Sequence, residues 1–430
     1  MILTLNNIGK IEKATVELNG ITIIAGENNT GKSTVGKTLF CIFNSFYKIE
    51  EQIQRERKNA IRKALDIIYN PIYRGARILD IEELIENLLQ NSEIYKSDIN
   101  PLKNRLKEYL IYDGEIDKYV NENFYDSSDF ENTVKRILQI ISIPDEEILK
   151  TVLSQKFNAE FNNQINNIYS DDEDGIVELK IKDTNIEILI QDNEVKSISK
   201  NLSLNTEVIY IDDPFVLDEI RPSLFYLRTE GYANHRLHLQ SKLRDIKEGF
   251  GIEDAINKII VTDKMMDITS KIDDVCSGKM IKSSNGKFVY KENNLDKVLD
   301  IKNISTGLKT FVILKTLLLN GSIEDNGTII LDEPEIHLHP EWQILFAEII
   351  VLLQKKFNMH ILLNTHSPYF LRAIQVYSAK YEIADKCNYY LAESIDDRVT
   401  IKDVTTSIDE VYAKLAKPFE ILEIARYSDD

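Results

Sequence analysis

Residues 26–33 read Gly26-Glu27-Asn28-Asn29-Thr30-Gly31-Lys32-Ser33, and this stretch decides the fold class. An apolar run over residues 21–25 precedes it, and residues 32–47 carry apolar side chains at helical spacing. Two glycines, a lysine and a serine at this spacing, between a strand and a helix, are typical of a phosphate-binding loop. The alternative, an accidental Gly/Asn turn, does not require that context. The sequence therefore predicts an ATP-binding α/β protein.

Each residue type in this loop has a chemical task. Gly26 and Gly31 let the backbone aim successive amides at phosphate oxygens. Lys32 is expected to reach the β- and γ-phosphates and to act in catalysis, and Ser33 to coordinate Mg²⁺. The predicted nucleotide-binding residues of this stretch are Asn28, Asn29, Thr30, Gly31, Lys32, Ser33 and Thr34.

A second motif lies where an apolar run over residues 328–331 ends in two acids, Asp332 and Glu333. Consecutive strand residues point to opposite sides, so the two carboxylates can have different tasks. Ligands of α/β sheets bind at the carboxyl ends of strands. We expect Asp332 to hold Mg²⁺ and Glu333 to orient and polarise the attacking water. A plain Asp-Glu-Pro turn is the alternative.

Two further polar segments lie at the boundaries of predicted elements. One follows a predicted strand, and the other precedes a predicted helix. His366 follows the apolar run 361–363 and is predicted to contact the γ-phosphate or the attacking water, although a lone histidine is more often structural. Ser305 and Gly307 precede a helix predicted over residues 310–319, where small residues can form an anion site. By itself this last pattern is weak.

The bulk composition bounds the function classes. The chain has 430 residues and a formal net charge of -18, which argues against a protein that coats nucleic acid nonspecifically. A basic run over residues 54–63 is interpreted as a solvated helix face. No apolar run reaches the roughly 20 residues of a membrane span, and no secretory signal is recognisable, so we expect a cytoplasmic protein with no membrane partner. The three separated cysteines favour free thiols over a zinc site.

Four segments are predicted along the chain. Residues 1–47 are the first part of the ATPase core, and residues 48–160 are a helical insertion. Residues 161–300 supply β-strands of the core and a second helical insertion. Residues 301–430 alternate helix and strand, which implies a parallel α/β core.

The order of these motifs resembles that of the ATP-binding-cassette ATPase superfamily, in its SMC/RecF-like branch. Two segments resemble motifs of the overcoming-lysogenization-defect (OLD) group: residues 333–340, Glu-Pro-Glu-Ile-His-Leu-His-Pro, and residues 364–371, Asn-Thr-His-Ser-Pro-Tyr-Phe-Leu. This group includes ATPase subunits of Septu, retron-associated and PARIS-type anti-phage systems. The resemblance implies an α/β ABC-type head with a mixed or parallel sheet core and an antiparallel β subdomain, plus a helical insertion.

The resemblance also implies roles for residues. Ser305 and Gly307 fall at the signature motif, which in that family caps ATP bound to a second copy in a head-to-tail homodimer. Residues 335–340 correspond to the dimer-facing loop, and His366 to the switch histidine. Leu308 departs from the family, which carries Glu or Gln there. The glutamine loop cannot be placed, with Gln240 or the Asp212-Asp213 turn as candidates.

The leading functional hypothesis is an ATPase that acts as sensor or scaffold in an anti-phage complex. The residues after Leu371 are too few for a nuclease domain, so we expect the effector, a nuclease or toxin, to be a separate chain. The alternative is a RecF-type repair or recombination ATPase, which needs a basic face for DNA. A nucleotide-switched interaction module with negligible turnover is a third reading.

Overall fold

The computed structural model describes residues 1–66, 76–78, 80–112, 125–169, 174–200, 202–220, 234–245, 264–283, 286–293, 297–395 and 398–427. The chain divides into two compact units. One unit combines Met1–Tyr47 with Val152–Asp430, and the other is Lys48–Thr151. Across the described ranges, every helix is too short or too polar to cross a membrane.

Five parallel strands form the half of the main sheet that carries the motifs. Their order is β15, β3, β14, β13, β9, and each neighbouring pair is parallel. These strands are nearly continuous apolar runs, as expected where helices cover both faces of a sheet. The strands are β3 (Ile21–Gly26), β9 (Val208–Ile211), β13 (Thr328–Asp332), β14 (His360–Thr365) and β15 (Cys387–Ile395).

The other half of the same sheet is largely antiparallel. Beyond β15 the order is β16, β2, β1, β6, β7, β8, and only the β16–β2 pair is parallel. These strands are β1 (Ile2–Ile8), β2 (Ile11–Glu17), β6 (Gly175–Ile181), β7 (Thr184–Gln191), β8 (Glu194–Ile198) and β16 (Arg398–Asp403). The predicted fold class, a mixed sheet with a parallel core and an antiparallel part, is confirmed.

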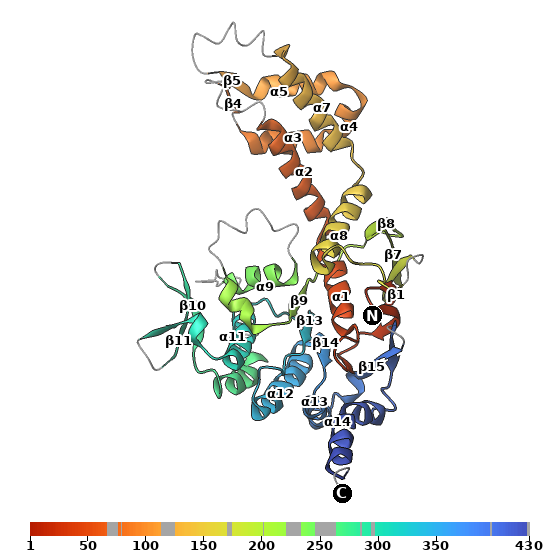
Figure 1. Cartoon of the computed structure of the whole chain (residues 1–430). Helices are drawn as coiled ribbons and strands as arrows, with labels where there is room; N and C mark the ends of the chain where they lie inside the picture. The colour runs from red at the N-terminus through yellow and green to blue at the C-terminus, as the bar shows by residue number, and fades with distance from the viewer. Residues whose placement is uncertain are drawn as a thin grey trace. The chain divides into compact units, whose positions relative to one another are not determined.

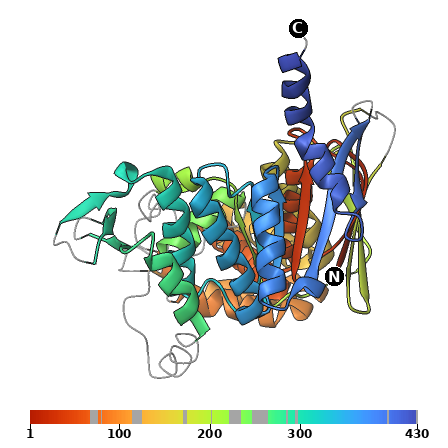
Figure 2. The same ribbon diagram turned by 90° about the horizontal axis from the view of Figure 1, so that it is seen from below.

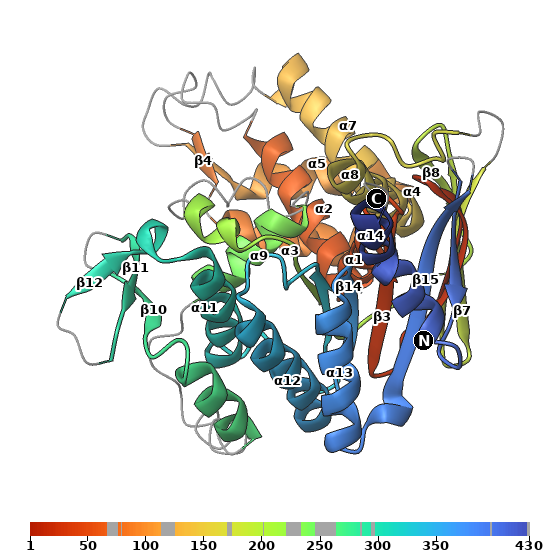
Figure 3. The same cartoon turned by 60° about the horizontal axis from the view of Figure 1, so that its bottom comes forward.

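Helices cover both faces of the parallel half. On one face, α1 (Lys32–Phe46) packs so closely that a Cβ on Gly36 would lie 3.0 Å from the Ile330 side chain. On the other face, α11 (Thr306–Leu319), α12 (Pro340–Phe357) and α13 (Pro368–Lys380) lie side by side, as Figure 3 shows, and in teal to blue in Figure 2. Ile329, Leu331, Ile361 and Leu363 belong to the core on this second face. The alternation of buried residues along each strand thus fills two cores.

Helix α11 begins earlier than the sequence suggested. The prediction placed its start at Thr310, whereas the helix starts at Thr306 because the Ser305 hydroxyl accepts a hydrogen bond from the Leu308 amide at 3.4 Å. Serine is a preferred residue at a helix N-cap.

The first unit has further elements around this sheet. They are α8 from Val152 onward (the helix spans Asp145–Phe161), η1 (Pro214–Glu219), α9 (His235–Arg244), η4 (Ile301–Asn303), η5 (Ala384–Lys386), α14 (Asp409–Tyr427) and a small sheet of β10 (Lys279–Lys282), β11 (Phe288–Lys291) and β12 (Val298–Asp300).

The second unit has its own apolar core. Ile61, Leu84, Ile85, Phe130 and Ile137 are buried together in it. Figure 1 shows its helices α2, α3, α5 and α7 close to one another. Its elements are α2 (Ile49–Leu65), β4 (Ala76–Ile78), α3 (Ile81–Gln90), α4 (Ser92–Ser97), α5 (Ile99–Tyr109), β5 (Leu110–Tyr112) and α7 (Ser128–Ser142).

The basic run of residues 54–63 lies in this second unit, where three of its cationic side chains bind carboxylates and one of these also binds backbone carbonyls. Arg57 is buried and donates to the Ile141 carbonyl at 3.0 Å and to Asp145 at 2.6 Å. Lys58 pairs with Glu86 at 2.9 Å, and Arg62 pairs with Glu82. These cations are engaged inside the unit rather than gathered on an open basic face.

Candidate functional site

Strand register brings the three motif-bearing strand ends to one edge of the sheet. Asp332 of β13 pairs with Asn364 of β14, and Thr365 of β14 pairs with Ala25 of β3. Because parallel strands end on the same side, the residues that follow them are neighbours there. Gly26, Glu333 and His366 therefore come together from segments far apart in the sequence.

The loop between β3 and α1 has the backbone of an anion site. Asn29 and Gly31 adopt left-handed conformations, with φ of 64° and 72°, and Gly31 caps α1. Such turns orient successive amides toward one point, where the positive end of the helix also acts. A Cβ on Gly26 would lie 2.6 Å from the Ala392 carbonyl oxygen, so this position has no room for a side chain.

Lys32 is buried at the centre of the motif, with a side chain only 4% exposed. Its Nζ donates to the carbonyl oxygens of Gly26 at 3.1 Å and Glu27 at 2.8 Å. The same Nζ lies 3.5 Å from Glu333 Oε1. A buried ammonium needs such partners, and a phosphate oxygen can replace the carboxylate among them.

The two acids after β13 have different surroundings. Asp332 accepts hydrogen bonds from the Tyr210 hydroxyl at 2.7 Å and from the Asn364 side-chain amide at 2.9 Å, which together fix its orientation. Glu333 has a left-handed backbone with φ of 51°, and its amide donates to the Asn364 carbonyl at 2.9 Å. Left-handed backbone is costly for a residue with a side chain and gathers at functional sites.

His366 completes what we call the open cluster, defined as Lys32, Glu333 and His366. Its Nδ1 lies 3.5 Å from Glu333 Oε1, and that nitrogen makes no hydrogen bond within the described residues. The imidazole is 39% exposed and the Glu333 side chain 25% exposed. Both contacts to Glu333 are longer than ordinary hydrogen bonds, so a phosphate oxygen or a water can replace either of them.

Glu335 holds the backbone of His366 in place through a hydrogen bond. It is buried, and Oε1 accepts hydrogen bonds from the Thr365 hydroxyl and from the His366 amide at 3.2 Å. Burial, opposed by these hydrogen bonds, raises the pKa of Glu335. Within the segment 335–340, Ile336 and His339 are exposed whereas Glu335 is turned inward. Sequence reasoning assigned the whole segment one role and missed this one.

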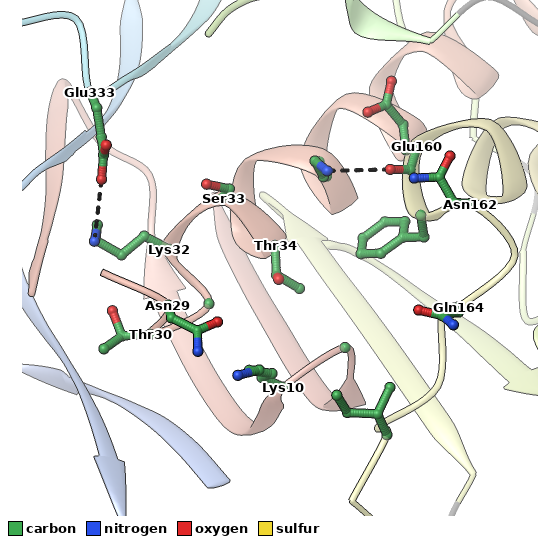
Figure 4. A pocket seen from close by; sticks show the side chains of 15 residues that line it. Lys10, Asn29, Thr30, Lys32, Ser33, Thr34, Glu160, Asn162, Gln164 and Glu333 are labelled. Atoms are coloured by element: carbon green, nitrogen blue, oxygen red, sulfur yellow. Dashed lines mark hydrogen bonds and ion pairs between the residues drawn. The ribbon is translucent and has the colours of Figure 1, made fainter. Parts of the chain in front are cut away.

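A cleft of about 350 Å³ runs along the phosphate loop. Figure 4 shows Glu333 and Lys32 at one end, Ser33 and Thr34 in the middle, and Asn162 and Gln164 at the other end. Of the predicted nucleotide-binding residues of the loop, all but Asn28 line it. Its lining is Gly9, Lys10, Asn29, Thr30, Gly31, Lys32, Ser33, Thr34, Lys37, Glu160, Phe161, Asn162, Gln164, Ile168 and Glu333.

Ser305 and Gly307 are not among the residues that line this cleft. Ser305 is exposed at the start of α11, whereas Gly307 is buried. A Cβ on Gly307 would lie 2.9 Å from the His337 carbonyl oxygen and 3.2 Å from the Trp342 ring. Gly307 is therefore required for close packing inside its own chain.

A second acid–histidine group, which we call the closed cluster, consists of Glu160, Asp212 and His235. His235 Nδ1 lies 2.7 Å from Glu160 and Nε2 lies 3.1 Å from Asp212, with side chains of His235 and Glu160 only 9% and 1% exposed. The two carboxylates overcome the opposing effect of burial and raise the pKa of His235 to about 9. The ring stacks on Tyr210 with centroids 4.4 Å apart.

Sequence reasoning did not find the closed cluster or Tyr210. A single polar side chain in the apolar run Val208–Ile211 was the available signal for Tyr210. Nothing in the sequence pairs Glu160 with His235, because they come from separate helices. Asn364 begins the segment 364–371, but its position in the sequence assigns no role to it.

The residues present fit ATP and Mg²⁺. The left-handed turns, the buried ammonium and the helix start suit a polyphosphate. Mg²⁺ takes few protein ligands beside phosphates and waters, and a hydroxyl and a carboxylate are of the types it binds; Ser33 lines the cleft, whereas Asp332, at the end of β13, is not among its lining residues. Among the described residues no group of three or more His, Cys, Asp or Glu side chains could hold a metal by itself.

The sequence profile of the AAA ATPase domain family matches residues 1–371. Retron Vc95 probable ATPase of Vibrio cholerae serotype O1 biovar El Tor is 32% identical over 102 residues, which are 21% of this chain and 19% of that protein. Retron Ec83 probable ATPase of Escherichia coli is 33% identical over 91 residues, 19% of this chain and 16% of that protein. The matches thus span less than a fifth of either relative.

Solved structures of SMC heads are also similar. An SMC head bound to the C-terminal winged-helix domain of ScpA aligns over 95% of this chain and 98% of that chain, with a TM-score of 0.44 and 10% identity. The SMC head domain from Thermotoga maritima aligns over 94% of this chain and 98% of that chain, with a TM-score of 0.35 and 10% identity.

Proposed function

The chain belongs to the AAA ATPase domain family, and we propose that it binds ATP with Mg²⁺ and hydrolyses it at the cleft beside the phosphate loop. The observation that carries this proposal is the open cluster. The Lys32 ammonium and the His366 imidazole each lie 3.5 Å from the Glu333 carboxylate, and the three residues follow the ends of three strands. A lysine that binds the phosphates and a side chain that positions the attacking water are recurring parts of sites for phosphoryl transfer to water.

Each residue has a task in this proposal. Lys32 and the loop amides bind the β- and γ-phosphates, and Thr34 contacts the α-phosphate. Ser33 and Asp332 hold Mg²⁺, which supplies charge neutralisation when bound. Glu333 orients the attacking water and accepts its proton, while His366 contacts the γ-phosphate or that water. Binding of phosphate at Lys32 releases Glu333 from its ion pair, so the substrate itself prepares the base.

The test is the Glu333→Gln substitution, measured by steady-state phosphate release and by calorimetric ATP binding. We expect turnover to fall roughly 100-fold or more, since a positioned acid or base contributes on that order. ATP affinity should stay the same or increase. Glu341→Gln, an exposed residue at the start of α12, is the matched control and should behave as the wild type. Normal turnover in Glu333→Gln would refute the catalytic assignment.

Head-to-tail pairing is the second part of the proposal. Ser305 does not line the cleft of its own chain, yet it stands exposed at a helix start that can bind an anion. In a head-to-tail pair, the Ser305 of one copy would reach the γ-phosphate of ATP bound to the other copy. With ATP, Glu333→Gln should therefore run as a dimer in analytical ultracentrifugation, and adding Ser305→Arg should return it to the monomer. Gly307 is a poor probe because its replacement disturbs packing. A stable dimer of the double variant would contradict this arrangement.

A role as sensor or scaffold subunit of an anti-phage complex, with a separate effector chain, is supported by the two retron relatives. We expect the chain and its neighbouring genes together to reduce plaque formation, and Glu333→Gln to abolish the reduction. Protection that survives both Glu333→Gln and Lys32→Ala would exclude a role for this ATPase. The repair alternative predicts salt-dependent DNA binding, and the engaged cations of residues 54–63 do not favour it.

A further inference from the structure

The end of the cleft that lies away from Glu333 is formed by one short segment, residues 160–168. Phe161, Asn162, Gln164 and Ile168 from this segment line the cleft together with Lys10 from the turn between β1 and β2. Phosphate chemistry accounts for Lys32, Ser33 and Thr34 but requires no aromatic ring, aliphatic side chain or neutral amide. This wall therefore suits a different part of the ligand.

The direction of the ligand follows from the proposed function, on which this inference rests. With the γ-phosphate between Lys32 and Glu333, the phosphate chain runs past Ser33 toward Thr34. In Figure 4, Asn162 and Gln164 lie beyond Thr34 on the side away from Glu333. The nucleoside of a bound nucleotide must project toward them.

We propose that residues 160–168 form the base-recognition wall of the cleft and select adenine. Phe161 supplies an aromatic surface for the base, and Ile168 an apolar edge. The side-chain amides of Gln164 and Asn162 pair with the base edge. A carboxamide can accept from the adenine N6 amino group and donate to N7, whereas guanine offers acceptors at both positions.

The segment is held rigidly, as a recognition wall must be. The Gly9 amide donates to the Ile165 carbonyl at 2.8 Å, and the Ile168 amide donates to the Gly9 carbonyl at 3.2 Å. The Asn193 side chain accepts from the Ile165 amide at 2.7 Å. The two bonds to Gly9 fix the backbone of the segment to the turn that carries Lys10, and the bond to Asn193 fixes it to the turn between β7 and β8.

The side chains of Asn162 and Gln164, which would contact the base, are not used in holding the segment in place. Asn162 has a left-handed backbone with φ of 50°, and both Asn162 and Gln164 are exposed. In the described part of the chain, neither side-chain amide makes a hydrogen bond. Phe161 has the Lys37 ammonium 6.0 Å from its ring centroid, and Lys37 also donates to the Glu160 carbonyl at 3.3 Å. Phe157 stacks on the Phe161 ring with centroids 5.9 Å apart and holds it at the cleft wall.

The test measures calorimetric binding of ATP, GTP and inorganic tripolyphosphate to the full chain with Mg²⁺. The wild type should bind ATP at least about tenfold more tightly than tripolyphosphate, because stacking of one base is worth roughly that factor or more. Phe161→Ala should weaken ATP binding about tenfold and leave tripolyphosphate binding unchanged. Gln164→Ala should bring ATP and GTP to within about threefold of each other.

Gln54→Ala, an exposed glutamine outside the cleft lining, is the control and should match the wild type in all three titrations. Unchanged tripolyphosphate binding shows that each variant is folded. If Phe161→Ala and Gln164→Ala bind ATP and GTP as the wild type does, the base wall is refuted while the ATPase proposal stands. If the wild type binds neither ATP nor tripolyphosphate, the proposed function fails, and the base wall with it.

Discussion

The open cluster and the closed cluster each place a histidine beside a carboxylate at the end of a core strand, but in different surroundings. The closed cluster has two carboxylates, Glu160 and Asp212, whereas the open cluster has one, Glu333, together with the Lys32 ammonium. In the closed cluster both ring nitrogens of His235 meet carboxylates within 3.1 Å. In the open cluster Glu333 is 3.5 Å from both of its partners, and the His366 side chain is 39% exposed. A buried histidine with a carboxylate beside each ring nitrogen stabilises the fold, whereas a partly exposed one with longer contacts is available to a ligand.

The largest effect should come from removing the histidine of the closed cluster. His235→Gln leaves Glu160 and Asp212 without their shared cation, and breaking a buried pair in this way costs about 3 kcal/mol. The free energy of unfolding, measured in urea, should fall by that order. His366→Gln should stay within about 0.5 kcal/mol of the wild type, as is usual for exposed positions. Equal losses in the two variants would erase the distinction between the clusters.

A pH dependence sharpens the same point. The pKa of His235 is raised to about 9 in the folded protein, so its stabilisation is complete below about pH 6.5 and is lost as pH rises through 9. Between those values the folded protein keeps a proton that the unfolded chain has released. Stability should fall by about 1 kcal/mol per pH unit from pH 7 to 9. His235→Gln should flatten this slope, and a slope that persists in the variant would assign it to other groups.

Replacing the histidine of the open cluster should have a smaller effect, and that effect should be on catalysis rather than on stability. His366→Gln should lower the turnover number about tenfold, less than the roughly 100-fold expected of a proton-transfer group, because its role is to contact the γ-phosphate or the attacking water; the KM for ATP should stay nearly unchanged. His235→Gln, assayed where it remains folded, should keep the KM as well and lose less turnover. A histidine at residue 366 that can be replaced without loss of rate would be structural, as lone histidines usually are.

The smallest effect should arise at Tyr210, which connects the closed cluster to Asp332. Tyr210 stacks on His235 and donates to Asp332, so Tyr210→Phe removes one hydrogen bond but retains the ring. Asn364 still orients Asp332. The Mg²⁺ concentration for half-maximal activity should rise about fivefold, which corresponds to the roughly 1 kcal/mol of a typical hydrogen bond. An unchanged Mg²⁺ dependence would separate Asp332 from the metal.

The motifs at strand ends were predictable because their physics is local. A strand, a glycine turn and a helix start are contiguous in sequence, and the register of parallel strands then brings Glu333 and His366 beside Lys32 without further information. The closed cluster depends on packing between α8, β9 and α9, which no spacing encodes. Burial of Glu335 was missed for a related reason, because its partners Thr365 and the His366 amide lie on another strand. The family match confirms the predicted ATPase class, while the residue roles stay predictions.

The position of β3 in the sheet has a consequence for how the protein is made. Its two neighbours are β14 and β15, and the pairing of Ile21 with Ile361 joins residues about 340 positions apart. At about 5 to 20 residues per second, a ribosome needs on the order of half a minute to supply those partners. Until then the phosphate-loop strand is an apolar segment with two unpaired edges. Newly made chains should therefore depend on chaperones during synthesis.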